Sequence, residues 1–168
     1  DNESFCVEKP TVCIVEIMGR NAGWLTAAAA LAKGEDCSGV DAIYLPERVF
    51  DMDKFMATVK HLAETKSSVV IAVSEGIHVA DGKYVCELAN ENVAVDAFGH
   101  KQMSGTAAFL AAQVAAESGL KTRAVEFSTL QRAATHMASL TDINEAFHVC
   151  NRMNVISAGS ALVRIVTI

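Results

Sequence analysis

Residues 12–23 read VCIVEIMGRNAG, a nearly continuous apolar run, interrupted by Glu16, that passes into a glycine-containing turn. Such nearly continuous runs, rich in β-branched residues, are typical of strands that are buried on both faces of a parallel sheet. Residues 68–76, SVVIAVSEG, have the same form and also end in a polar turn. We therefore expect two buried parallel strands, at residues 12–18 and 68–74, each followed by a loop that carries charge.

Strands and helices are expected to alternate along the rest of the chain. Further strands are predicted at residues 42–45, 123–128 and 161–168, and helices at residues 22–33, 52–65, 106–117 and about 142–157. This order, interrupted by an insert at residues 77–105, predicts an α/β three-layer sandwich with a mainly parallel sheet and right-handed crossovers. Within the insert, Asp81 and Gly82 indicate a hairpin turn.

The expected helices carry recognisable start and stop residues. Asp51, Ser104 and Thr141 precede or open three of them and can accept a hydrogen bond as N-caps. Glycines that follow three of the helices are expected to end them, namely Gly34, Gly119 and Gly159.

Length and composition limit the class of protein. A chain of 168 residues with 51% hydrophobic and 20% charged residues predicts one domain, residues 1–168, and excludes a disordered tail or a coiled coil. A net charge of −6 argues against a nucleic-acid binder, and no apolar run is long enough to span a membrane. The five cysteines have no metal-ligand spacing and indicate reduced thiols in a cytoplasm rather than zinc ligands. Apolar runs close to both ends suggest a piece of a longer protein.

Most candidate ligand-binding residues follow the predicted strands, because sheets of this kind bind ligands at the carboxyl ends of their strands, whereas Arg123 opens a strand. Arg20 begins a helix after a glycine turn and can bind an anion, although the same turn can carry an ordinary solvated arginine. Glu75 can accept hydrogen bonds from hydroxyl groups or be a plain loop glutamate. Arg123, Thr129 and Arg132 can form an oxyanion cluster or be separate surface groups. Neither the G-x-x-x-x-G-K-[ST] nor the G-x-G-x-x-G nucleotide motif is present.

Five segments then place these residues in a known context. IVEIMGRNAGWLTAAAALA, YLPE, VVIAVSEG, DAFGHKQMSG and KTRAVEFSTLQRAATHMASLTDINEAF occur in this order. Together they resemble the phosphofructokinase family, and in particular its pyrophosphate-dependent branch, from about residue 11 to residue 168. The resemblance implies a phosphofructokinase-like fold whose substrate-binding domain holds fructose 6-phosphate.

The resemblance also implies roles for individual residues. Met18, Gly19 and Arg20 match the family's fructose 6-phosphate loop, and Glu75 matches a glutamate that hydrogen-bonds the sugar. Arg123 matches an arginine that reaches the sugar phosphate, in related oligomers from a neighbouring subunit.

Two positions near the end of the resemblance complete the implied site. Arg132 matches a phosphate-binding arginine, and Thr129 stands where ATP-dependent relatives carry a histidine. ATP-dependent relatives also carry an arginine where this chain has Thr11, close to Lys9.

The family's GGD and TIDND-type segments, which hold the phosphoryl donor, the catalytic aspartate and Mg²⁺, are absent from this sequence. The resemblance therefore implies the sugar-phosphate-binding domain of a glycolytic 6-phosphofructokinase, with no catalytic or metal-binding residue of its own. The implied partners are fructose 6-phosphate, pyrophosphate bound elsewhere, and further copies of the chain in a homo-oligomer. Two alternatives stay open here: an ATP-dependent enzyme of the same fold, and a non-catalytic regulatory half.

Overall fold

The computed structural model describes residues 9–89, 105–134 and 138–157. The chain divides into two compact units, Asp1–Gln131 and Arg132–Ile168, and each is described by itself. The assignment of residues 1–168 to one domain stays a prediction. In the described ranges, every helix is too short or too polar to cross a bilayer.

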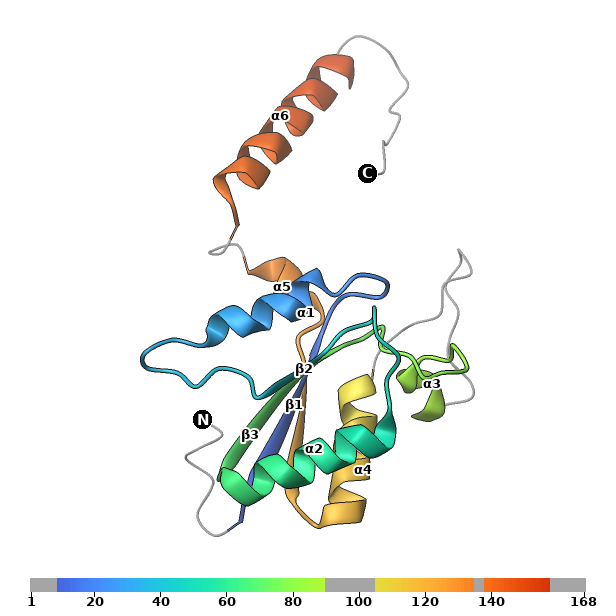
Figure 1. Cartoon of the computed structure of the whole chain (residues 1–168). Helices are drawn as coiled ribbons and strands as arrows, with labels where there is room; N and C mark the ends of the chain where they lie inside the picture. Colours follow the sequence, from blue (N-terminus) through green and yellow to red (C-terminus); the bar gives the residue numbers. More distant parts are fainter. Residues whose placement is uncertain (1–8, 90–104, 135–137, 158–168) are drawn as a thin grey trace. The chain divides into compact units, whose positions relative to one another are not determined.

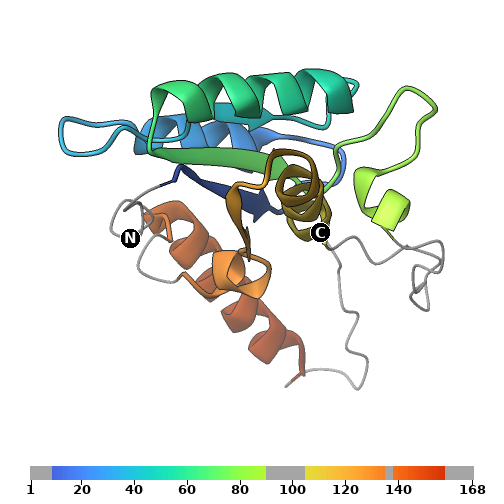
Figure 2. The same cartoon turned by 90° about the horizontal axis from the view of Figure 1, so that it is seen from below.

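The first unit is built on a sheet of four parallel strands. In sheet order these are β2 (Ala42–Tyr44), β3 (Ser68–Ser74), β1 (Thr11–Ile17) and β4 (Lys121–Glu126). Figure 2 shows β3, β1 and β4 in succession. The prediction of a mainly parallel sheet is confirmed. Strand β4 starts and ends two residues earlier than the strand expected at residues 123–128. The strand predicted at residues 161–168 lies outside the described residues.

Helices connect these strands on both sides of the sheet. In chain order the helical elements are α1 (Trp24–Ala28), the 3₁₀ turn η2 (Ala29–Ala32), α2 (Met52–Thr65), α3 (Val85–Ala89), α4 (Thr106–Ser118), α5 (Thr129–Ala133) and α6 (Leu140–Ser157). In Figure 1 the sheet is seen nearly edge-on, with α1 on one side and α2 and α4 on the other. The three-layer arrangement predicted from the sequence is therefore confirmed.

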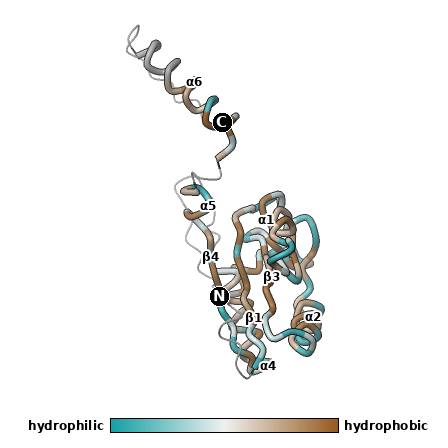
Figure 3. The backbone as a smooth tube through the Cα atoms, turned by 90° about the vertical axis from the view of Figure 1, so that its left-hand side faces the viewer, coloured by the Kyte–Doolittle hydropathy of each residue, from teal (hydrophilic) through white to brown (hydrophobic). Residues whose placement is uncertain are grey.

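The core fills the space between the sheet, α2 and α4. Alternate residues of β1 and β3 face it, and parallel pairing sets Val12 beside Val69 and Ile14 beside Ile71. Phe55 of α2 is fully buried against this layer. Figure 3 shows the hydrophobic colouring of both strands. The other face of β3 is buried as well, for example at Ala72. Burial on both faces explains why apolar residues follow one another in this strand instead of alternating with polar ones.

Some of the predicted helix ends are confirmed. The Asp51 carboxylate accepts a hydrogen bond from the Lys54 N–H of α2 at 3.1 Å, and Gly119 ends α4 in the left-handed conformation. Gly34 lies two residues beyond η2, and Gly159 lies outside the described residues.

Two predicted caps are wrong. Gly105, rather than Ser104, is the N-cap of α4, and it has no side chain with which to cap the helix. Thr141 lies inside α6, whose first turn is capped by Ser139: the Ser139 Oγ accepts the Asp142 N–H at 3.0 Å.

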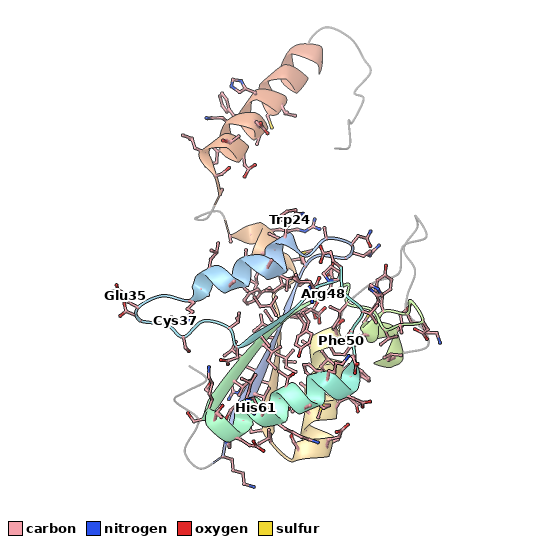
Figure 4. The ribbon with its side chains drawn as sticks, viewed as in Figure 1. Trp24, Glu35, Cys37, Arg48, Phe50 and His61 are labelled. Atoms are coloured by element: carbon pink, nitrogen blue, oxygen red, sulfur yellow. The ribbon has the colours of Figure 1, made fainter. Side chains whose placement is uncertain are left out.

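The segment after β1 differs from the single helix expected at residues 22–33. It is divided into α1 and η2, where Thr26 is the only buried side chain, so packing does little to hold one regular helix. Trp24, labelled in Figure 4, lies at the surface of α1 with 83% of its area exposed. In the insert, the expected hairpin is a turn closed by one antiparallel bridge between His78 and Tyr84, with Gly82 at φ +82°.

A core substitution tests this packing. Phe55→Ala removes a fully buried ring from between α2 and the sheet, and we expect it to lower the free energy of unfolding by about 3–5 kcal/mol. His61→Ala, an exposed change on the same helix, should stay within about 0.5 kcal/mol. Urea unfolding of the two variants measures the difference, and equal losses would contradict the assigned core.

Candidate functional site

Parallel register brings two of the predicted loops to one place. Ile17, the last residue of β1, pairs with Ser74, the last residue of β3. The N–H of Glu75 continues the ladder by donating to the Ile17 carbonyl at 3.0 Å. The loops that carry Arg20 and Glu75 therefore leave the sheet side by side, as expected for the carboxyl ends of neighbouring parallel strands.

The peptide groups on both sides of Gly19 are held by the second loop. The Gly19 N–H donates to Glu75 Oε1 at 3.2 Å, and the Ser74 hydroxyl donates to the Gly19 carbonyl. Gly19 has φ +153°, and a Cβ there would lie 2.6 Å from the Ala22 carbonyl oxygen. A side chain at position 19 is thus excluded by space as well as by conformation.

Gly76 allows the two loops to touch. A Cβ at this position would lie 1.8 Å from the Arg20 carbonyl oxygen, well inside van der Waals contact. The backbone of residue 76 consequently packs directly on the backbone of Arg20. Glycine at position 76 is a condition for the two loops to meet at all.

A third segment reaches the same loop from β4. The Phe127 N–H donates to the Glu16 carbonyl at 3.1 Å, and Ser128 then turns the chain with φ +39°. Gln131 Oε1 accepts the Met18 N–H at 2.8 Å. The start of α5, with Thr129 exposed at its first position, is thereby fixed beside the residue 18–20 loop.

On its other side, the loop is tied to the segment after β2. Glu47 Oε1 accepts the N–H of Gly23 at 2.7 Å, at the point where α1 begins. A Cβ on Gly23 would lie 2.8 Å from a Leu45 methyl carbon. Residues 44–47, the YLPE segment, therefore hold the chain at Gly23. Together with the contacts at Gly19, this contact fixes the backbone on both sides of the half-buried Arg20.

Arg123, which the resemblance assigns to the site of a neighbouring subunit, lies away from the loop edge of its own chain. Arg123 pairs with Cys13, four positions before the end of β1, which puts it about 13 Å back along the strand from the loop edge. Its charge acts on that neighbour: burial raises the pKa of the Cys13 thiol, and the Arg123 guanidinium lowers it. Within its own chain, Arg123 is thus away from Gly19 and Glu75. Arg132 begins the second unit, and its approach to the loop stays a prediction.

Three residues that shape the loop were not found from the sequence. All three lay inside quoted segments without an assigned role: Gln131 in KTRAVEFSTLQRAATHMASLTDINEAF, Ser74 in VVIAVSEG and Glu47 in YLPE. Their spacing in the chain carries no signal, because each meets the loop only through the sheet topology. In the part of the chain that the structure describes, no group of three or more His, Cys, Asp or Glu side chains is arranged to hold a metal ion.

Comparisons with known proteins agree on one family. A family model described as phosphofructokinase matches residues 6–138. A pyrophosphate–fructose 6-phosphate 1-phosphotransferase from Xanthomonas campestris is 46% identical over 80% of this chain and 32% of its own length. One of the same name from Halomonas elongata is 38% identical over 89% of this chain and 35% of its own length.

Solved structures give the same result. The crystal structure of a pyrophosphate-dependent phosphofructokinase from Nitrosospira multiformis superimposes with a TM-score of 0.64 at 32% identity, over 86% of this chain and 32% of that one. The chain thus spans about a third of the length of the relatives it matches.

The close approach at Gly76 can be tested by adding one methyl group. Gly76→Ala must push the Arg20 carbonyl away, and we expect a loss of about 1–3 kcal/mol in unfolding free energy with a shifted Gly19 amide resonance. Gly34→Ala, where a Cβ meets nothing within 4 Å, is the matched control and should leave both unchanged. An undisturbed Gly19 amide in Gly76→Ala would show that the two loops do not depend on this contact.

Proposed function

Because the chain belongs to the phosphofructokinase family, we propose that it forms the fructose 6-phosphate-binding part of a longer, pyrophosphate-dependent 6-phosphofructokinase. The observation that carries this proposal is the meeting of the residue 18–20 loop with Glu75 at the Gly19 peptide, beside the start of α5. The names of the relatives support pyrophosphate as the phosphoryl donor and fructose 6-phosphate as the acceptor. This chain spans about a third of the length of these relatives, which supports a longer polypeptide. Such an enzyme belongs to glycolysis and, in our proposal, to the cytoplasm.

The side chains at this edge suit a phosphorylated sugar. A guanidinium can bind a phosphate group through two parallel charge-assisted hydrogen bonds, the role we assign to Arg20 and Arg132. In the described residues, Glu75 uses Oε1 for Gly19, so Oε2 is the oxygen that we assign to a sugar hydroxyl. The N–H groups of Met18 and Gly19 are already engaged by Gln131 and Glu75, so they set the shape of the loop rather than bind the phosphate.

Arg123 fits a site formed between copies of the chain. It is exposed on β4, the outermost strand of the sheet among the described residues, and lies away from the Gly19 edge of its own chain. An exposed guanidinium can reach a ligand on an adjacent molecule. We therefore propose a homo-oligomer in which Arg123 serves the sugar phosphate of a neighbouring subunit.

The proposed reaction transfers a phosphoryl group between two oxygens. The 1-hydroxyl oxygen of fructose 6-phosphate forms a bond to one phosphorus of pyrophosphate, the bridging P–O bond breaks, and the hydroxyl proton passes to a base. Catalysis of such transfers rests on positioning and on charge stabilisation. This chain would supply the position of the acceptor. Pyrophosphate, the base and Mg²⁺ are assigned to the remainder of the polypeptide, because the GGD and TIDND-type segments that hold them in the family are absent from this sequence.

Kinetics of the complete polypeptide test the assigned phosphate contact. Arg132→Ala should mainly raise the KM for fructose 6-phosphate, because it removes roughly 2–4 kcal/mol of binding that is shared by ground state and transition state. Lys60→Ala, an exposed cation on α2, is the control and should leave KM unchanged. An unaltered KM in Arg132→Ala would remove this arginine from the site.

The division of the work between the two parts is tested with the chain alone. The 168-residue chain should bind fructose 6-phosphate weakly and show no turnover with pyrophosphate or with ATP, since we assign the base and the donor site elsewhere. A coupled assay with each donor measures this. Phosphorylation of the sugar by the chain alone would contradict the assignment, and turnover of the complete polypeptide with ATP in place of pyrophosphate would correct the donor.

A further inference from the structure

A buried carboxylate caps a helix that lacks a cap of its own. Glu16 lies on the core face of β1 with 3% of its area exposed, and its Oε2 accepts the Ala107 N–H at 2.9 Å. The N-cap of that helix, α4, is Gly105, which has no side chain to offer. The first turn of α4 therefore takes its acceptor from a strand 91 residues earlier in the chain.

The same helix end holds the loop that carries Glu75. Thr106, the first residue of α4, donates its hydroxyl to the Glu75 carbonyl at 3.3 Å. The Glu75 side chain in turn accepts the Gly19 N–H at 3.2 Å. A short series of hydrogen bonds thus runs from the Glu16 carboxylate through the N-terminus of α4 to the peptide of Gly19.

The environment of Glu16 explains why its charge matters. Burial raises the pKa of this carboxyl group, the Ala107 and Gly105 N–H groups lower it, and the carboxylates of Glu126 and Glu75 raise it. Burial raises the pKa of the Cys86 thiol of α3, and the charges of Glu87 and Glu16 raise it further. Since the neighbouring charges are negative, the favourable partner of the carboxylate is the N-terminus of α4, with its free N–H groups and positive dipole end.

We propose that Glu16 is a positioning residue for the acceptor site, holding the end of α4 so that Thr106 and Glu75 keep the residue 18–20 loop in its binding geometry. This inference rests on the proposed function for its effect on substrate, but the hydrogen bonds that carry it belong to the chain itself. The carboxylate Oε2 accepts the Ala107 N–H in a charge-assisted hydrogen bond. Glutamine of the same size offers a neutral, weaker acceptor and an NH₂ donor, so Glu16→Gln should weaken the hold on the first turn of α4.

Amide hydrogen exchange in the 168-residue chain tests the series directly. In Glu16→Gln we expect the Gly19 amide to exchange about tenfold faster. This is the change in exchange rate expected when about one charge-assisted hydrogen bond no longer stabilises the closed form of the loop. The Phe55 amide, capped by the Asp51 carbonyl in α2, should not change. Glu117→Gln removes a carboxylate from the far end of α4 and is the matched control. Unchanged Gly19 exchange, or equal acceleration at Gly19 and Phe55, would overturn the proposal.

Fructose 6-phosphate kinetics of the complete polypeptide separate this inference from the proposed function. Glu16→Gln should raise KM roughly threefold to tenfold with little change in kcat, and Glu75→Gln should raise it as well. If neither variant changes KM, the proposed function fails; if only Glu75→Gln does, the role of Glu16 alone fails.

The pH dependence gives a readout that a purely structural role would not move. As the pH falls through the raised pKa of Glu16, the wild-type carboxyl gains a proton and loses an acceptor, as in Glu16→Gln. The ratio of the KM of Glu16→Gln to the KM of the wild type should therefore fall toward one in acid. Ionisation of the substrate affects both KM values equally and cancels from this ratio. A ratio independent of pH would overturn the proposal. If Glu16→Gln does not fold, the wild-type chain carries the test: the protection of its Gly19 amide should decrease as the pH falls through the raised pKa of Glu16, and unchanged protection would overturn the proposal.

Discussion

Direct contact between two backbones, at Gly76 and Arg20, is the constraint on which the site depends. The parallel pairing of β1 with β3 ends at Ile17 and Ser74, so the two following loops must pass through the same space. They can do so because position 76 has no Cβ, which would lie 1.8 Å from the Arg20 carbonyl oxygen. Once the backbones touch, Glu75 and Ser74 are close enough to bind the Gly19 peptide from both sides.

The contacts around this point leave the loop little freedom. Gln131 holds Met18 from the start of α5, and Glu47 holds Gly23 from the segment after β2. A pre-shaped loop does not have to be ordered when ligand binds, which saves conformational entropy at that step. In a chain with a net charge of −6, the overall field does not attract an anion, so the phosphorylated ligand that we propose depends on local groups such as Arg20.

The sequence predicted the elements well because their apolar periodicity is strong. Residues 52–65 and 68–74 form α2 and β3 with the predicted bounds. One error lies where a tertiary contact replaces a local one: the first turn of α4 is capped by Glu16 rather than by Ser104, since the acceptor comes from a distant strand. For the same reason, the meeting of the residue 18–20 loop with Glu75 could be expected from strand ends, whereas the contact of Gln131 with Met18 could not. Whether the matched residues bind substrate was predicted only through family resemblance.

We propose that the Gly19–Glu75 meeting point binds fructose 6-phosphate. Titration of the isotope-labelled 168-residue chain with this sugar, followed through its amide resonances, measures this binding, because weak millimolar binding is visible by this method. We expect saturable shifts at Gly19, Arg20 and Glu75, smaller shifts with unphosphorylated fructose, and none at Phe55 of α2. Saturable shifts confined to other parts of the sheet, or no difference between the phosphorylated and the free sugar, would contradict the proposal.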